Sequence, residues 1–80
     1  MLLRWRSGSE TGLLGFHLYR QAEGARARVN RALVAARGGA AGRAYTFRDR
    51  LPRGTGQVRY WLEELRLDGS RVLHGPVRSG

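Results

Sequence analysis

The sequence predicts an all-β fold, and three observations support this fold class. Apolar and polar residues alternate wherever aromatic residues occur, and a period of two is typical of strands that bury one face. Short stretches rich in glycine, serine, aspartate or proline separate these segments about every 8–15 residues. No segment shows a long helical period, and 80 residues suffice for one domain, 1–80, with a single thin core.

The first half of the chain contains two clear strands and one ambiguous segment. Residues 2–6 and about 14–20 alternate around large apolar side chains, with a polar, glycine-containing turn between them. The segment 27–35 contains valines that suit a strand and alanines that suit a short helix. The glycines at 38–39 would end such a helix, so both interpretations stay open.

The second half of the chain contains three further strands. Residues 44–48 alternate around two aromatic side chains, and residues 57–67 alternate up to Asp68-Gly69, which is a strong hairpin signal. The glutamates and leucines before this pair also suit a helix, but the hairpin signal favours a strand. A Gly-Pro pair interrupts the last strand, 71–77, which favours a position at the edge of its sheet.

The inward positions of these segments define the expected core. Two tryptophans, three tyrosines and two phenylalanines supply the large anchors, each able to bury on the order of 150–250 Å². The predicted core consists of Leu3, Trp5, Phe16, Leu18, Val29, Tyr45, Phe47, Tyr60 and Leu62.

The charge of the chain is strongly positive, and it has two interpretations. The net charge is +9, and all fifteen basic residues are arginine. Arginine makes forked contacts to phosphate, which would suit an Arg-rich nucleic-acid-binding domain. The arginines, however, are scattered along the chain and never form a run of three, and alanine and glycine are abundant too. We therefore favour a compositional bias and disfavour nucleic acid as the partner.

The sequence contains no signal for catalysis, a metal ion or a cofactor. Cysteine is absent, and His17 and His74 are the two histidines, without the spacing of a metal site. The serines occur in turns or at the chain end, with no base placed to activate them. Glu63 and Glu64 are adjacent on a strand and point to opposite faces, so Glu64 points inward and needs a partner. We expect no enzyme, no cofactor and, because no apolar run is long enough, no membrane span.

The order of several short motifs gives a family resemblance. The motifs are Leu3-Arg4-Trp5, Ser9-Glu10, residues 14–20, Val29-Asn30, residues 45–49, residues 60–64, Asp68-Gly69 and residues 74–77. Together they resemble a fibronectin type III-like module of the kind found near the C-termini of bacterial secreted and cell-surface proteins. The resemblance covers nearly the whole chain. It implies an immunoglobulin-like sandwich that serves as a spacer, adhesion or protein-interaction domain, located outside the cell or on its surface.

Two departures from this family change the expected architecture. Such modules begin with a strand before the one that contains Leu3 and Trp5, and this sequence has none. We therefore expect about six strands, from a chain that is a fragment, a reduced version or a member completed by another segment. The family's corner tyrosine matches Val58, so Tyr60, two residues later, is the nearest substitute.

One exposed face is a candidate binding surface. In the implied fold the strands that contain Phe16 and Tyr60 are neighbours, so their outward residues share one face. These residues are His17, Tyr19, Arg59, Trp61 and Glu63. Tryptophan, tyrosine and arginine dominate binding hot spots, so the face could hold another protein or an adjacent domain of a parent chain. Simple cross-strand stabilisation of the sheet explains the same residues.

The first strand is a second candidate, because without a preceding strand its backbone forms an open edge. This edge consists of Leu2, Leu3, Arg4, Trp5 and Arg6. Unpaired strand edges accept further strands, which predicts a homodimer through this segment. The two arginines oppose the pairing only in part.

Overall fold

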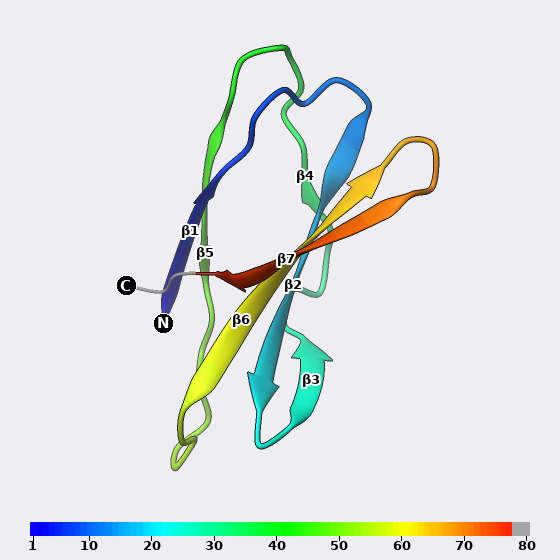
Figure 1. The fold of residues 1–80 in the computed structure, drawn as a ribbon. Helices are drawn as coiled ribbons and strands as arrows, with labels where there is room; N and C mark the ends of the chain where they lie inside the picture. Colours follow the sequence, from blue (N-terminus) through cyan, green and yellow to red (C-terminus); the bar gives the residue numbers. More distant parts are fainter. Residues whose placement is uncertain (78–80) are drawn as a thin grey trace.

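The protein, described here by a computed structural model of residues 1–77, contains seven strands and no helix within those residues (Figure 1). The strands are β1 (Leu2–Arg6), β2 (Leu13–Ala22), β3 (Ala25–Arg28), β4 (Val34–Ala35), β5 (Ala44–Arg48), β6 (Val58–Arg66) and β7 (Arg71–Val77). This confirms the all-β fold class.

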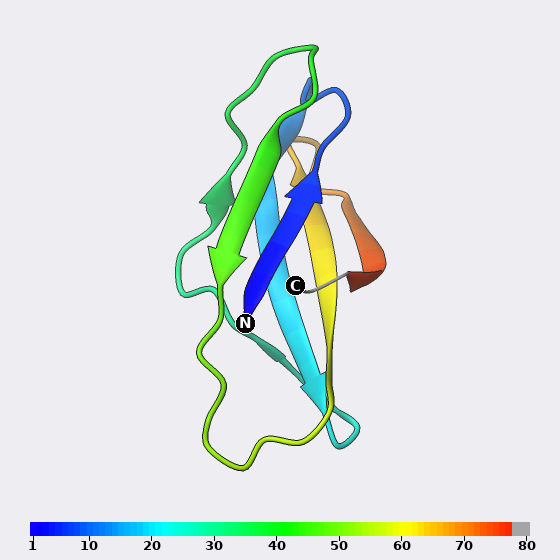
Figure 2. The ribbon, with the colours of Figure 1, turned by 90° about the vertical axis from the view of Figure 1, so that its left-hand side faces the viewer.

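The strands form two sheets of unequal size. The large sheet has the order β3-β2-β6-β7, and β4 also pairs with β2. The small sheet contains β1 and β5 alone, paired antiparallel. Figure 2 looks onto the small sheet, with β1 and β5 in front of β2 and β6. The two sheets are therefore two layers, each with an inner and an outer side.

The core lies between the layers because each long strand alternates in burial. Leu3, Phe16, Leu18 and Tyr60 are almost completely buried, and they come from both sheets. Tyr45 fills the centre, with its ring centroid 4.9 Å from that of Phe16 and near the Trp5 ring. Aromatic pairs in this range add about 0.5–1.5 kcal/mol to simple burial.

The predicted core is confirmed with three positions less buried than the rest. Trp5, Val29 and Phe47 are partly buried and pack against the central cluster, while the other predicted residues are buried. The sequence interpretation missed Leu13, which is also buried. Leu13 is the first residue of β2, which begins one residue before the predicted strand.

The ambiguous segment 27–35 is not a helix, and the strand interpretation holds only at its two ends. It contributes the end of β3 and the whole of β4, which pair with different parts of β2. Between them, Asn30 takes over the role of a strand backbone. Its Oδ1 accepts from the Leu18 backbone N–H at 2.8 Å, and its Nδ2 donates to the Phe16 carbonyl at 3.3 Å. The extra strand explains why seven strands are present where about six were expected.

The later strands follow the sequence prediction. Residues 58–66 form strand β6 and not a helix, so the hairpin signal was the correct guide. Strand β7 lies at the edge of the large sheet, as the Gly-Pro pair predicted. Its register on β6 shifts between Tyr60 and Leu62.

A buried ion pair joins the two layers at one end. Asp49 follows β5 and is 6% exposed, and its Oδ2 lies 2.7 Å from Nη1 of Arg20 on β2. The Tyr60 hydroxyl donates to the same oxygen at 2.7 Å, and burial together with this bond raises the pKa of Tyr60 to about 12. Tyr60 therefore bonds a side-chain carboxylate, not the backbone that a corner tyrosine contacts.

Candidate binding face

The outer side of the large sheet holds the five predicted face residues in one array. The prediction that their strands are neighbours is confirmed, because β2 and β6 pair along most of their length. Tyr19 lies directly opposite Trp61, and His17 lies directly opposite Glu63. Arg59 lies opposite Gln21, which the sequence interpretation did not include. We call this array, with Gln21, the β2–β6 face.

Tyr19 and Glu63 fix one another on this face. The Tyr19 hydroxyl donates to Glu63 Oε1 at 3.0 Å, and Arg71 of β7 approaches the same oxygen at 3.6 Å. Partial burial, followed by the bond to Glu63, raises the pKa of Tyr19. The single carboxylate of the face is therefore engaged within the protein.

Trp61 is held from three directions. Its indole Nε1 donates to Gln21 Oε1 at 3.1 Å, and the guanidinium carbon of Arg26 lies 4.6 Å from the ring centroid. The backbone of Gly75 packs so closely that a Cβ at this position would lie 2.3 Å from the ring. The Trp61 ring is thus fixed in place, and only glycine fits opposite it at position 75.

The surroundings of His17 favour its neutral form. Partial burial, followed by the nearby positive charge of Arg28, lowers the pKa of His17. Its Nδ1 also lies 3.1 Å from the side-chain nitrogen of Asn30. Among residues 1–77 no group of three potential ligands could hold a metal ion. His17 is therefore a positioned polar side chain at the border of the face.

Arginines surround the aromatic centre. Arg26, Arg28, Arg59 and Arg71 are all exposed, and Glu63 is the one acidic residue among them. The sequence interpretation missed Arg26, because it began the third segment at residue 27, and it missed Arg28, because it did not pair this segment with the strand that contains Tyr19. The signal was present, since residues 25–28 read Ala-Arg-Ala-Arg directly after a Glu-Gly turn.

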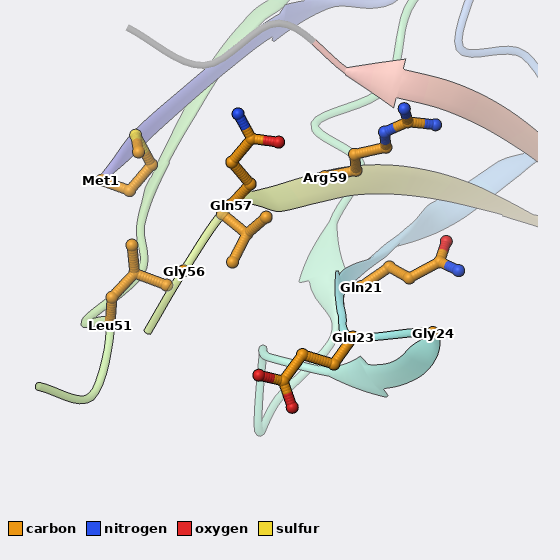
Figure 3. Close-up of a pocket in the computed structure, with 9 residues that line it drawn as sticks. Met1, Gln21, Glu23, Gly24, Leu51, Gly56, Gln57 and Arg59 are labelled. Carbon is orange, nitrogen blue, oxygen red and sulfur yellow. The ribbon is translucent and has the colours of Figure 1, made fainter. Parts of the chain in front are cut away.

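An open hollow lies at one end of the molecule (Figure 3). It has a volume of about 560 Å³ and lies between the start of β1, the β2–β3 turn and the loop before β6. Glu23 and Arg59 are the charged residues of the lining that the structure describes. This lining brings together no serine, histidine or second carboxylate, so it offers no arrangement for acid–base or nucleophilic chemistry.

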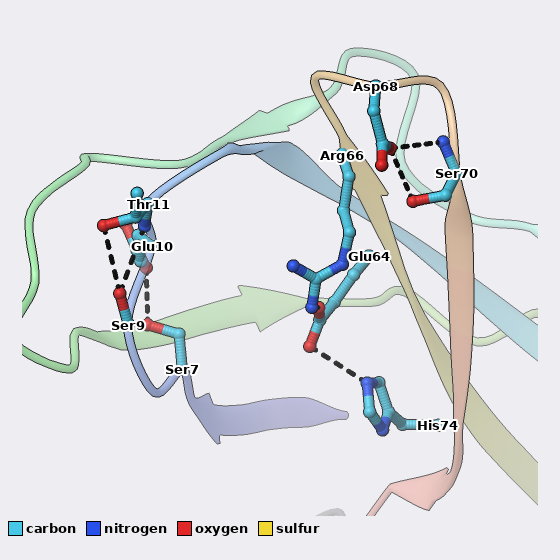
Figure 4. A network of polar contacts seen from close by, with 9 residues as sticks. All are labelled: Ser7, Ser9, Glu10, Thr11, Glu64, Arg66, Asp68, Ser70 and His74. Atoms are coloured by element: carbon cyan, nitrogen blue, oxygen red, sulfur yellow. Dashed lines mark hydrogen bonds and ion pairs between the residues drawn. The ribbon is translucent and has the colours of Figure 1, made fainter.

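The remaining polar side chains form local networks (Figure 4). Glu64 points inward as predicted, and it accepts from Arg66 Nη2 and contacts His74 Nε2, both at 2.9 Å. At the other end of the same view, the buried Glu10 accepts a bond from Ser7. Glu10 also accepts bonds from the Tyr45 hydroxyl and the Gly38 N–H. These bonds outweigh the opposing effect of burial and lower the pKa of Glu10. The sequence interpretation missed this buried carboxylate.

The second candidate, the edge at residues 2–6, is strand β1 of the small sheet. Strand β1 (Leu2–Arg6) pairs with β5 along one side, and no strand of residues 1–77 pairs with its other side. Arg4 and Arg6 are exposed, while Leu3 and Trp5 point toward the core.

Comparison with known proteins identifies no relative. No family model, curated protein or solved structure matches this chain. The resemblance to fibronectin type III-like modules thus rests on the motifs in the sequence. The described part of the chain also contains no helix of the length and apolarity that a membrane-spanning helix requires.

Proposed function

We propose that this chain is a non-catalytic, fibronectin type III-like module that binds another protein or an adjacent domain through the β2–β6 face. In this proposal it serves as a spacer, adhesion or interaction domain of a larger bacterial protein that is secreted or displayed at the cell surface. The β2–β6 face is its functional centre, and no chemical step is assigned to it.

The observation that carries this proposal is the fixed aromatic pair. Tyr19 and Trp61 lie side by side, and each is held by a hydrogen bond to a neighbouring side chain, Glu63 or Gln21. Aromatic side chains that are already ordered lose little conformational entropy when a partner covers them. A rim of exposed arginines around such a centre has the composition of an interface hot spot.

Site-specific crosslinking tests this proposal. A photoreactive amino acid at position 59 lies on the β2–β6 face, and the same group at position 46 lies on the opposite side of the molecule. We expect position 59, and not position 46, to crosslink one defined protein in the cells that produce this chain. Mass spectrometry then identifies that protein.

The purified partner allows a quantitative check. Arg59→Ala should weaken its affinity at least tenfold, which corresponds to about 1.4 kcal/mol, with the melting temperature unchanged. Arg53→Ala, an exposed arginine in the loop before β6, serves as the matched control and should leave the affinity unaltered. Equal crosslinking from both positions, or no effect of Arg59→Ala, would show that the face only stabilises the sheet.

The open edge of β1 supports a second contact, a homodimer. Antiparallel pairing of two copies of β1 would join both small sheets into one sheet of four strands. Analytical ultracentrifugation tests this contact directly. A concentration-dependent dimer supports the edge as an interface, and a monodisperse monomer at high concentration rules it out.

A further inference from the structure

The small sheet forms a ribbon of two antiparallel strands with one outer side. Because residues alternate along each strand, the inward positions take the core residues and the outward positions share one side. The outward residues are Leu2, Arg4 and Arg6 of β1, with Ala44, Thr46 and Arg48 of β5. Five of these six are exposed, and Leu2 is half-buried. Figure 2 looks onto this ribbon.

The three arginines of the ribbon meet no acidic side chain. Strands β1 and β5 contain no aspartate or glutamate, and within residues 1–77 no ion pair involves Arg4, Arg6 or Arg48. Five of the six acidic residues instead accept hydrogen bonds elsewhere: Glu10, Asp49, Glu63, Glu64 and Asp68. The ribbon therefore carries unneutralised positive charge.

The register places these arginines close together in space. Arg4 lies directly opposite Thr46 and diagonal to Arg48, whose partner is Leu2. Arg4 and Arg6 are two residues apart on one strand, about 7 Å along its axis. The arginines are scattered in the sequence, yet strand alternation and pairing gather three of them on one small surface. That scatter was one of the two reasons to disfavour nucleic acid, and on this surface the strand pairing brings three of the arginines together.

The shape of this surface fits a groove of double-stranded DNA. The major groove is about 12 Å wide and admits a ribbon of two β-strands, about 5 Å apart. No further strand of residues 1–77 widens the ribbon at either edge. Thr46 and Ala44 present small apolar groups of the kind that contact a thymine methyl, and arginine pairs with guanine or phosphate. Arg43, directly before β5, and Arg50, two residues after its end, are exposed and could contact the flanking phosphates.

We infer that the β1–β5 ribbon binds double-stranded DNA, with Arg4, Arg6 and Arg48 entering the major groove. A single strand fits less well, because the ribbon presents no aromatic side chain on which bases would stack. A membrane surface also fits less well, because the ribbon lacks the exposed large apolar side chains that insert between lipids. The inference is independent of the β2–β6 face, which lies on the other outer side.

Fluorescence anisotropy with the whole chain tests the inference. The probe is a labelled DNA duplex of about 20 base pairs, a length that offers two full turns of groove. The test variant is Arg4→Gln/Arg6→Gln/Arg48→Gln. The matched control is Arg26→Gln/Arg28→Gln/Arg59→Gln, which removes the same charge from the opposite outer side. Circular dichroism confirms that both variants stay folded.

The expected results follow from counterion release. The ribbon variant should lose at least tenfold in duplex affinity at about 50 mM salt, and the slope of log affinity against log salt should flatten by about 2.7. The control should change affinity less than about threefold, as expected for charge away from the contact.

Four results would overturn the inference. The first is no binding of the duplex by the wild-type chain at low salt, and the second is an equal loss of affinity for both triple variants, which would mean that bulk charge alone binds DNA. The third is stronger binding of a single strand, and the fourth is displacement of the duplex by poly-glutamate at equal charge concentration. Displacement by poly-glutamate would assign the ribbon to an acidic protein instead.

Discussion

The two outer sides of the molecule use arginine in different ways. On the β2–β6 face, Arg71 approaches a carboxylate and Arg26 lies over an indole ring, so both guanidinium groups have partners within the protein. On the β1–β5 ribbon, Arg4, Arg6 and Arg48 have no carboxylate on their strands. Two of the four arginines around the β2–β6 face are therefore held by partners, while the other two, like the three of the ribbon, form no ion pair within residues 1–77.

This difference separates two kinds of recognition. Ordered side chains favour a partner of complementary shape, because little conformational entropy remains to be lost on binding. Free guanidinium groups favour a ligand with regularly spaced negative charge, where affinity follows the number of phosphate contacts and falls with salt. The net charge of +9 therefore does not tell how much unpaired positive charge lies on either outer side of the molecule. That quantity depends on where each carboxylate lies.

The largest expected effect comes from breaking the link between the two layers. Asp49→Ala removes the buried carboxylate and leaves Arg20 and the Tyr60 hydroxyl without their acceptor. Breaking a buried ion pair from one side typically costs about 3–5 kcal/mol, a large part of the stability of a domain this small. Urea denaturation should show this loss as a lower midpoint.

The control for Asp49→Ala is Arg4→Gln, which changes an exposed ribbon side chain. Its effect on stability should stay within about 0.5 kcal/mol. If both variants have the same urea midpoint, the Asp49 contacts do not hold the two layers together. The positions of the two outer sides relative to one another would then not depend on this ion pair.

The second-largest effect is expected when a carboxylate is introduced into the ribbon. Thr46→Glu places an acidic side chain directly opposite Arg4 and next to Arg48. Cross-strand pairing should stabilise the fold slightly, by about 0.2–1 kcal/mol, while duplex DNA affinity falls about tenfold. Thr46→Gln is the neutral control in the anisotropy assay. Unchanged affinity in the Glu variant would contradict a role for the ribbon.

The third effect frees one arginine of the opposite side. Glu63→Gln removes the only carboxylate of the β2–β6 face and releases Arg71 from its ion pair. The total low-salt affinity for duplex DNA should then rise about two- to threefold, through weak binding at this side. Glu23→Gln, with the same charge change in the β2–β3 turn, is the control. A gain of equal size there would mean that only total charge matters.

The smallest expected effect is on thermal stability, and it occurs only at acid pH. Hydrogen bonds lower the pKa of Glu10 from its ordinary value of 4.5, so the ionised carboxylate stabilises the folded state. That contribution is complete above about pH 4.5 and is lost as the pH falls through the lowered pKa. Thermal denaturation should show a melting temperature that declines below this pH. The decline should be shallower in Glu10→Gln, and an identical decline in both proteins would show that Glu10 is not its source.

Hydrophobic alternation was enough to predict most of the fold. The inward positions around Leu3, Phe16 and Tyr60 were correct because a strand with one buried face leaves a period of two in its sequence. The same period placed Tyr19 and Trp61 on one outer side once their strands were taken as neighbours, and the register confirms it.

The missed features depend on contacts between distant parts of the chain. The Asn30 side chain accepts a hydrogen bond from the backbone of β2, as the backbone of a neighbouring strand would. No local pattern in 27–35 predicts this contact. Glu10 lies in a polar stretch and is buried only because Tyr45 and Gly38 reach it from 28 or more residues away. The ribbon was missed for the same reason, since Arg48 joins Arg4 only through the pairing of β5 with β1.

The free edge of β1 makes its two proposed contacts mutually exclusive. A dimer through this edge would double the width of the ribbon to four strands, about 15 Å between the outermost backbones and too broad for the major groove. Each molecule could then hold either a second copy or a duplex, but not both. Raising the protein concentration would favour dimers and lower the fraction of protein that is free to bind DNA. Adding DNA would in turn dissociate dimers. The dimer equilibrium and the DNA-binding equilibrium would therefore be coupled.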